Sequence, residues 1–302
     1  MASSQPYRGR FAPSPTGPLH FGSLVAALAS CLDARANRGE WLVRIEDVDE
    51  ARAVAGAADD ILRTLEAFGF EWEGEIARQS RRTDLYRDAL DRLRRLGVAY
   101  DCACSRKDIA GAARVGLEGP VYDGRCRRGA PLDASARAVR VRTHDEPIPV
   151  ADDVYGACSQ RLESAVGDFV VRRADGYFAY QLAVVVDDAD QGITRVVRGA
   201  DLLSSTPRQV YLQGLLGLPT PGYAHVPLVL DAAGRKLGKR DLAHPIDPRR
   251  PLPALLAAWA FLGQLTAPEQ PASQTEFWDF AVERWNLGRV PARSPPVGAA
   301  DT

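Results

Sequence analysis

The first 45 residues constrain the fold most strongly, because an extended stretch, a helical pattern and a second extended stretch follow one another there. Residues 7–12 are partly apolar, and the prolines that come directly after them end the predicted strand. Apolar residues at helical spacing then predict a helix that stops at Gly39, and residues 41–45 predict a buried strand. Such a βαβ unit predicts an α/β fold with a parallel sheet and a right-handed crossover.

The rest of the chain alternates between helical and extended patterns, with one irregular stretch. Residues 101–176 contain many glycines, prolines and cysteines, and we interpret them as an inserted subdomain. A cap followed by proline at Thr206-Pro207 predicts the start of a helix, and Gly217 predicts its end. The other predicted elements are helices at 53–68, 83–96, 252–262 and 276–285, strands at 177–186, 193–197 and 224–230, and a turn at 231–234.

The overall charge excludes a polycation, because the net charge is -1 and the pI is near 6.5. Any contact with nucleic acid must therefore come from a local basic surface. Residues 87–95 and 125–142 are rich in arginine and could supply one, although solvated faces explain both stretches equally simply. No apolar run of about 18 residues and no apolar N-terminal signal is present, so we expect a soluble cytoplasmic protein without a membrane partner.

The segment between the first strand and the first helix is a candidate phosphate site. It reads Pro-Thr-Gly-Pro-Leu-His-Phe-Gly-Ser over residues 15–23. A helix start presents unpaired N–H groups and a partial positive charge. Gly17 and Gly22 would let a nucleotide approach the backbone, and His20 could donate to a phosphate oxygen. On these residues alone, a purely structural loop is an equally good interpretation.

Two further segments carry charge where a ligand could bind. Glu46 ends the second strand, at the edge where open α/β sheets bind ligands, and it could hold an amino group. Asp47 or Asp49 could instead simply cap the next helix. The basic stretch Arg-Lys-Leu-Gly-Lys-Arg at residues 235–240 could stabilise a triphosphate, or it could be a solvated turn.

Taken together and in this order, the motifs resemble the catalytic domain of glutamyl-tRNA synthetases, a class I aminoacyl-tRNA synthetase family. The resemblance spans residues 8–245 and rests on RFAPSPTG, HFGS, RIED, VRGADLLSSTPRQ and KLGKR. Ser23 stands where the first ATP signature usually has histidine, and Gly238 stands where serine is more common in the second. The lysines of the second signature are present, so neither departure indicates an inactive enzyme.

This resemblance implies the roles of individual residues. Arg198 suits a side-chain carboxylate, because guanidinium binds carboxylate in a bidentate manner and lysine does not; a plain surface arginine is the alternative for Arg198 and Arg10. The implied glutamate pocket consists of Arg10, Phe11, Ala12, Pro13, Ser14, Glu46, Tyr180 and Arg198. The implied ATP site consists of Pro13, Gly17, His20, Gly22, Ser23, Lys236 and Lys239, with His20, Lys236 and Lys239 as the catalytic residues.

The resemblance also implies a domain organisation with a Rossmann-like core. The five parts are the first half of the catalytic domain at 7–100, an inserted zinc-binding subdomain at 101–176, the second half with the basic ATP loop at 177–240, a helical stem-contact region at 241–290 and a disordered tail at 291–302.

Cysteines in the insertion suggest a metal. The chain has five cysteines, an odd number that argues against a disulfide framework. Cys102, Cys104 and Cys126 lie close together in sequence, which favours a tetrahedral Zn²⁺ site over free thiols. His144 could be the fourth ligand, whereas the resemblance implies Tyr122, whose phenol a bound cation could ionise.

The resemblance is greatest to the truncated members of the family, which attach glutamate to the queuosine base of tRNA(Asp). Only 62 residues follow Arg240, so we expect no anticodon-binding region. The implied reaction uses ATP with Mg²⁺ to activate L-glutamate without tRNA and then glutamylates queuosine-bearing tRNA(Asp), with the enzyme acting as a monomer. The alternatives are a truncated synthetase that charges tRNA(Glu) and a non-catalytic zinc-bearing RNA-binding paralogue.

Overall fold

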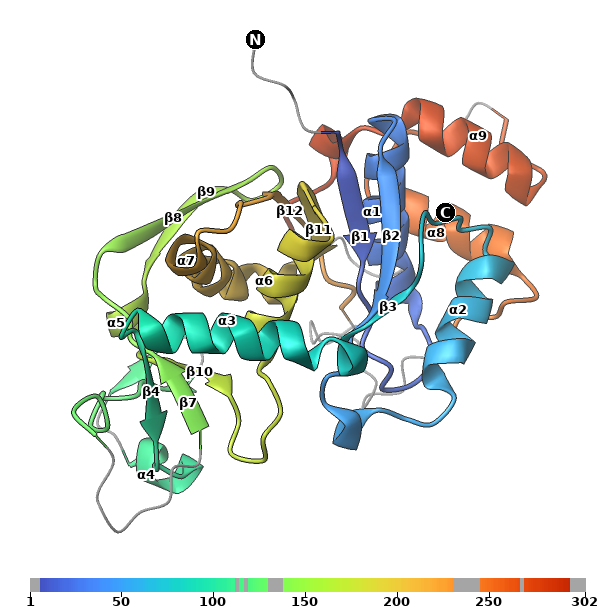
Figure 1. Ribbon diagram of the computed structural model, residues 1–302. Coiled ribbons are helices and arrows are strands. Elements are labelled where there is room, and N and C mark those ends of the chain that lie inside the picture. The colour runs from blue at the N-terminus through green and yellow to red at the C-terminus, as the bar shows by residue number, and fades with distance from the viewer. Residues whose placement is uncertain are drawn as a thin grey trace.

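Two groups of parallel strands from distant parts of the chain lie side by side at the centre of the molecule (Figure 1). β1 (Arg8–Phe11) pairs in parallel with β2 (Glu40–Ile45), and β2 pairs in parallel with β3 (Ala77–Arg78). α1 (Phe21–Ala36) joins β1 to β2, which confirms the predicted βαβ unit. The computed structural model describes residues 6–111, 114–116, 119–129, 138–230, 245–266 and 269–293.

The second half of the chain adds further parallel strands beside β1. β11 (Arg195–Gly199) pairs in parallel with β12 (Gly222–Val226), and β12 pairs in parallel with β8 (Pro147–Asp152). The N–H of Thr194, just before β11, donates to the carbonyl of Arg8 at 3.0 Å, so β1 and β11 lie side by side. β8 continues into an antiparallel hairpin with β9 (Gly156–Arg161).

The helix between β11 and β12 begins and ends as its sequence predicts. α7 (Thr206–Leu216) has Pro207 in its first turn, where a proline costs no hydrogen bond. Gly217 ends the helix with a φ of 59°, a left-handed conformation that glycine adopts without strain. The carboxyl end of β11, which leads into this helix through a short helical turn, lies in the wall of the cavity that forms the candidate site.

The predicted strand at 177–186 is wrong, because these residues run into a helix, α6 (Tyr180–Asp190). The three consecutive valines at 184–186 favour extended structure when the sequence is considered alone. In the fold, every residue from Leu182 to Asp188 is buried, since α6 packs against both α3 (Thr83–Arg95) and α7. A helix buried on several sides lacks the apolar stripe from which periodicity identifies a helix.

A small antiparallel sheet lies at one end of the molecule, away from the parallel sheet (Figure 1). It consists of β10 (Phe169–Arg172), β7 (Ala138–Val141) and β4 (Ala99–Cys102), in that order. The remaining short elements of the stretch interpreted as an insertion are α4 (Arg106–Ala110), β5 (Val115–Gly116), β6 (Gly119–Pro120) and α5 (Leu162–Ala165).

Helices from the two ends of the described chain cover the first half of the sheet. α8 (Pro251–Phe261) and α9 (Gln274–Arg284) pack against α1, and both confirm the predicted helices. α2 (Ala57–Ala67) begins after Gly56, which has no side chain to cap it. The short helical turns are Glu50–Arg52, Gln79–Arg81, Ala200–Ser205 and Leu287–Arg289. Within the described ranges, every helix is too short or too polar to cross a bilayer.

Candidate active site

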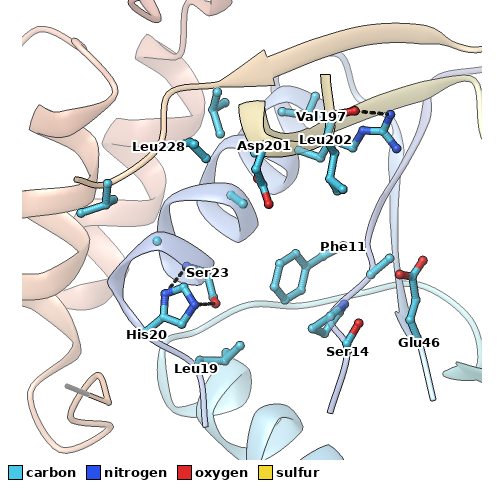
Figure 2. Close-up of a pocket in the computed structure, with 18 of the residues that line it drawn as sticks. Phe11, Ser14, Leu19, His20, Ser23, Glu46, Val197, Asp201, Leu202 and Leu228 are labelled. Carbon is cyan, nitrogen blue, oxygen red and sulfur yellow. Dashed lines mark hydrogen bonds between the residues drawn. The ribbon is translucent and has the colours of Figure 1, made fainter. Parts of the chain in front are cut away.

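A cavity of about 310 Å³ opens at the carboxyl ends of β1, β2 and β11, beside the start of α1. Figure 2 shows His20 and Ser23 at the helix start, Glu46 across the cavity from them, and Asp201 and Leu202 above. Eight residues predicted to bind glutamate all line it: Arg10, Phe11, Ala12, Pro13, Ser14, Glu46, Tyr180 and Arg198. Of the predicted ATP residues, Pro13, His20, Gly22 and Ser23 line the cavity, Gly17 is not in its wall, and Lys236 and Lys239 lie outside the described residues.

His20 fixes the tip of α1 in addition to facing the cavity. It is the N-cap residue, and its Nδ1 accepts a hydrogen bond from the Ser23 backbone N–H at 3.2 Å. Its Nε2 lies 3.2 Å from the Ser23 hydroxyl. Since Nδ1 is the acceptor, the neutral ring carries its proton on Nε2. The first turn of α1 contains no acidic side chain, so its N–H groups keep their attraction for an anion.

The described residues on either side of the basic stretch lie near the start of α1. Val229, on the N-terminal side, lines the cavity. When the described chain resumes at Pro245, that residue forms an isolated bridge with His20, and the N–H of Ile246 donates to the Leu19 carbonyl at 3.1 Å. Val229 and Pro245, which lie on either side of the stretch that contains Lys236 and Lys239, are therefore both placed near the start of α1.

Arg198 is a buried guanidinium whose partners among the described residues are all neutral. Its Nη1 donates to the Tyr180 hydroxyl at 3.2 Å, and its Nη2 donates to the Thr206 hydroxyl at 2.9 Å and to the carbonyl of residue 202 at 3.4 Å. Its side chain is 5% exposed, and no carboxylate of the described chain pairs with it. A buried charge without a counter-charge is costly, so this position favours an anionic ligand.

The remaining partner of Arg198 belongs to a pair that the sequence did not reveal. The Nε of Arg198 donates to Nε2 of His225 at 3.0 Å, and Nδ1 of His225 lies 2.6 Å from Asp152. Burial lowers the pKa of His225, so its ring is neutral near pH 7. Burial would raise the pKa of Asp152, but hydrogen bonds from His225 and from backbone N–H groups outweigh it and hold that pKa low.

Arg10, by contrast, forms a direct ion pair with a carboxylate. Its Nε and Nη2 donate to the two oxygens of Asp188 at 3.2 and 3.4 Å. Asp188 also forms an ion pair with Arg44 at 2.8 Å. The guanidinium of Arg44 in turn lies 3.3 Å from the Glu46 carboxylate. Burial would raise the pKa of Asp188, yet Arg10 and Arg44 keep it below its usual range, whereas burial raises the pKa of Glu46.

The two aspartates after Glu46 do not cap a helix. Asp47 accepts from the backbone N–H and the hydroxyl of Ser80, both at 2.8 Å. Asp49 forms an ion pair with Arg173. Both carboxylates therefore join the loop after β2 to other segments, and the capping interpretation is wrong.

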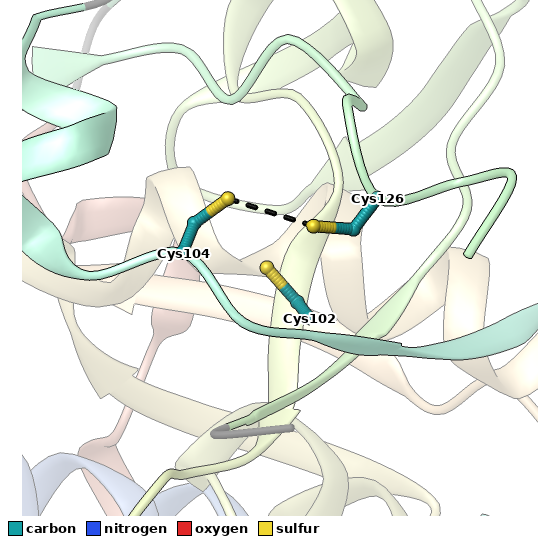
Figure 3. A group of neighbouring side chains, drawn as sticks. All are labelled: Cys102, Cys104 and Cys126. Atoms are coloured by element: carbon teal, nitrogen blue, oxygen red, sulfur yellow. Dashed lines mark hydrogen bonds between the residues drawn. The ribbon is translucent and has the colours of Figure 1, made fainter. Parts of the chain in front are cut away.

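Three cysteine thiols and one phenol converge in the small antiparallel sheet region. Figure 3 shows the side chains of Cys102, Cys104 and Cys126 pointing toward one another, and their sulfurs all lie within 4.8 Å. The Tyr122 hydroxyl lies 3.4 Å from Cys102 Sγ and 3.8 Å from Cys104 Sγ. The side chain of His144 accepts from the N–H of residue 146 and contacts the Tyr211 ring, so it is not part of this cluster.

The spacing of these four donor atoms fits a tetrahedral ion. Sulfur ligands of one zinc lie ~3.8 Å apart when each Zn–S bond is ~2.3 Å. The sulfurs of Cys104 and Cys126 are 3.6 Å apart. Arg140 donates to Cys102 Sγ at 3.3 Å, and its guanidinium lies 4.0 Å from the centre of the Tyr122 ring. That cation favours the anionic form of the donor set, as a zinc ligand set requires.

Comparison with known proteins first defines the class of protein. Residues 7–249 match the family model described as tRNA synthetases class I (E and Q), catalytic domain. The crystal structure of glutamate-tRNA synthetase from Elizabethkingia anophelis is similar with a TM-score of 0.82 and 27% sequence identity, over 98% of this chain and 69% of that chain. The fold is thus that of a class I tRNA synthetase catalytic domain.

Curated relatives narrow this class to one family. The glutamyl-Q tRNA(Asp) synthetase of Aromatoleum aromaticum is 56% identical over 290 residues, which cover 96% of this chain and 92% of the relative. The protein of the same name from Chromobacterium violaceum is 55% identical over 286 residues, covering 95% of this chain and 96% of the relative. The chain belongs to the class I tRNA synthetase family and, within it, to the glutamyl-Q tRNA(Asp) synthetases.

Proposed function

We propose that this ligase activates L-glutamate with ATP in the absence of tRNA and transfers the glutamyl group to the queuosine base at the wobble position of tRNA(Asp). The observation that carries the proposal is the buried, uncompensated charge of Arg198 in a cavity that also contains Glu46 and the start of α1. A cation, a carboxylate and a phosphate-binding helix start suit the side chain of glutamate, its ammonium group and ATP, respectively.

Arg198 and Tyr180 would hold the side-chain carboxylate of glutamate together. Four of the five N–H groups of Arg198 already have protein acceptors, which leaves one on Nη1. The Tyr180 hydroxyl accepts from Arg198, so its own proton can be donated to the ligand. The bidentate guanidinium contact inferred from sequence is therefore revised to one donor from each residue.

Glu46 would bind the ammonium group of the substrate. Its carboxylate lies in the cavity wall, and burial raises its pKa. A nearby ammonium stabilises the ionised carboxylate and offsets that burial. Arg44 holds the carboxylate from behind at 3.3 Å, which orients it toward the cavity.

The phosphates of ATP would lie between the start of α1 and the basic loop. Gly22 and Ser23 line the cavity there, and His20 fixes the turn. Lys236 and Lys239 would steady the phosphates, a role supported by the placement of the flanking residues Val229 and Pro245 near the start of α1. Gly17 would contribute only conformational freedom, since its φ is 142°.

The reaction would have two steps. An α-carboxylate oxygen of glutamate bonds to the α-phosphorus of ATP, and the bond from that phosphorus to the pyrophosphate oxygen breaks; Mg²⁺ enters with ATP. A hydroxyl of the queuosine cyclopentene ring then takes the acyl group, and AMP leaves. Neither step needs a protein nucleophile, because positioning and charge stabilisation supply the rate enhancement.

The domain organisation remains part of this proposal. We propose that residues 241–290 contact the stem of the tRNA and that the protein acts in the cytoplasm as a monomer. Sedimentation of the purified protein measures its oligomeric state, and a single species of about 32.8 kDa is the result expected of a monomer.

Glutamate-dependent exchange of pyrophosphate into ATP without tRNA is the expected activity. Among several amino acids only glutamate should support exchange, because its side-chain carboxylate suits the cation, its ammonium group suits the carboxylate, and aspartate, which has the same charges, is one methylene shorter. Queuosine-bearing tRNA(Asp) should then accept labelled glutamate. Stable product on tRNA(Glu) alone would instead favour a tRNA(Glu)-charging enzyme, and the absence of exchange would favour a non-catalytic RNA-binding protein.

We also propose that Cys102, Cys104, Tyr122 and Cys126 hold one Zn²⁺ in a structural role. Metal analysis should find about one zinc per chain. Cys126→Ser should lose the zinc and lower the melting temperature, because ion binding and folding are coupled. Cys158→Ser is the matched control, since that thiol is exposed and lies outside the cluster. A fully active, equally stable metal-free protein would reduce the cluster to a packing role.

A further inference from the structure

A buried pair, His225 and Asp152, lies directly behind the cavity-lining Arg198. Both side chains are 0% exposed. His225 lies on β12, one strand away from Arg198 on β11, and the two residues are register partners in this parallel pair. Asp152 ends β8, the next strand along. Neither His225 nor Asp152 lines the cavity itself.

The hydrogen bonds fix the proton of the imidazole. Nε2 of His225 must be unprotonated, because the Nε–H of Arg198 donates to it at 3.0 Å. The ring proton is therefore on Nδ1, which lies 2.6 Å from the Asp152 carboxylate. Asp152 is itself held by the backbone N–H groups of Val154 at 3.0 Å and Tyr155 at 2.8 Å. A series of hydrogen bonds therefore connects the turn at residues 153–155 with the guanidinium of Arg198 through Asp152 and His225.

This series of hydrogen bonds restricts the rotation of the Arg198 guanidinium. Thr206 and Tyr180 hold the two terminal nitrogens of Arg198, and the bond from Nε fixes the plane in which they lie. Without an acceptor, the buried Nε–H would lose its hydrogen bond and the plane could turn. Such a rotation of the guanidinium plane would move the one unused N–H of Nη1 away from the ligand carboxylate.

We propose that His225 and Asp152 are positioning residues that orient Arg198 and thereby determine the selectivity of the cavity for a side-chain carboxylate over the equal-sized amide. This inference rests on the proposed function, because it takes the side-chain carboxylate of glutamate as the ligand of Arg198. Asp152 acts through the neutral imidazole and does not contact the guanidinium, so Arg198 is oriented without a direct ion pair of the kind that Arg10 forms with Asp188.

The charges around His225 are consistent with a neutral, accepting ring. Asp152 faces it from β8, Arg198 from β11 and Arg10 from β1, and the Tyr223 ring stacks beside it with centroids 6.3 Å apart. The Thr206 hydroxyl on α7 is 3.3 Å from Nε2. Two of these neighbours are cations, which disfavour protonation of Nε2.

His225→Phe tests the inference, because it keeps an aromatic ring and removes the acceptor. In the tRNA-free exchange assay we expect the KM for glutamate to rise about tenfold, with the KM for ATP and kcat each changed by less than about threefold. The preference in kcat/KM for glutamate over glutamine should fall by a similar factor. His225→Gln, whose amide oxygen can accept from Arg198 Nε, should recover part of both effects.

A matched control is His144→Phe, the same substitution at an exposed ring outside the cavity. This variant should leave the KM values, kcat and the glutamate preference unchanged. A lower melting temperature of His225→Phe with an unchanged KM and unchanged glutamate preference would overturn the inference and leave a purely structural role. Nuclear magnetic resonance of the ¹⁵N-labelled imidazole, assigned by comparison with His225→Gln, should show the proton on Nδ1; a proton on Nε2 would also overturn it. Wild-type protein without glutamate-dependent exchange would instead refute the proposed function.

Discussion

Arg198→Ala should reduce kcat/KM for glutamate in pyrophosphate exchange by about 10²–10³-fold, the cost expected when one partner of a buried charge pair is removed. The fold should stay intact, because Arg198 has only neutral protein partners and its loss strands no carboxylate of the described chain. Exchange kinetics with glutamate as the variable substrate and a thermal unfolding curve measure the two quantities.

Arg195→Ala is the matched control for this prediction. Arg195 lies on the same strand, is 20% exposed and pairs with Asp33 and Asp153 outside the cavity. Its removal should change kcat/KM by no more than about twofold, because none of Arg195, Asp33 and Asp153 lines the cavity. Unchanged exchange kinetics in Arg198→Ala would remove Arg198 from the glutamate pocket and with it the observation that carries the proposed function.

Arg44→Leu should lower the free energy of unfolding by about 3–5 kcal/mol, because removing one partner of a buried ionic group leaves uncompensated charges. Arg44 is 0% exposed and reaches Asp188 at 2.8 Å, Glu46 at 3.3 Å and Asp187 at 3.7 Å. Urea unfolding measures the loss. Arg87→Leu removes an exposed arginine paired with Asp84 and should cost no more than about 0.5 kcal/mol.

The pH dependence of this variant has a defined sign. The pKa of Asp188 is lowered in the folded protein, so its ionised form stabilises the fold above the unfolded-state pKa. That contribution is lost as the pH falls through the lowered, folded-state pKa. Arg44→Leu removes part of it beforehand, so the stability gap between wild type and variant should narrow below about pH 4. A gap that is constant with pH would exclude Asp188 as its source.

The βαβ unit could be predicted from the sequence because it depends on local signals, such as the prolines and glycines of the loop before α1. Most of the cavity residues were predicted from the resemblance of the motifs to a known family, and the structure brings them together around one cavity. The helix start at Thr206 and the stop at Gly217 are equally local, and both were correct.

Features that depend on long-range packing escaped prediction. The valines before Asp187 and Asp188 suggested a strand, and only the packing of α6 on two sides explains why these aspartates are buried and paired with arginines. His225 is flanked by Ala224 and Val226 in an apolar strand, with no nearby residue to indicate that its partners lie on β8 and β11. The motifs thus predicted residues that line the cavity, but not the residues that hold those side chains in place.

The neighbouring placement of β1 and β11 has a consequence for how the molecule matures on the ribosome. Arg10 meets Asp188 across 178 positions, and the Asp152–His225 contact spans 73. Contacts of such long sequence separation form late, since loop closure must precede them. A nascent chain shorter than about 226 residues should therefore be unable to bind the amino acid, and during refolding the ability to bind it should return only in the final kinetic phase.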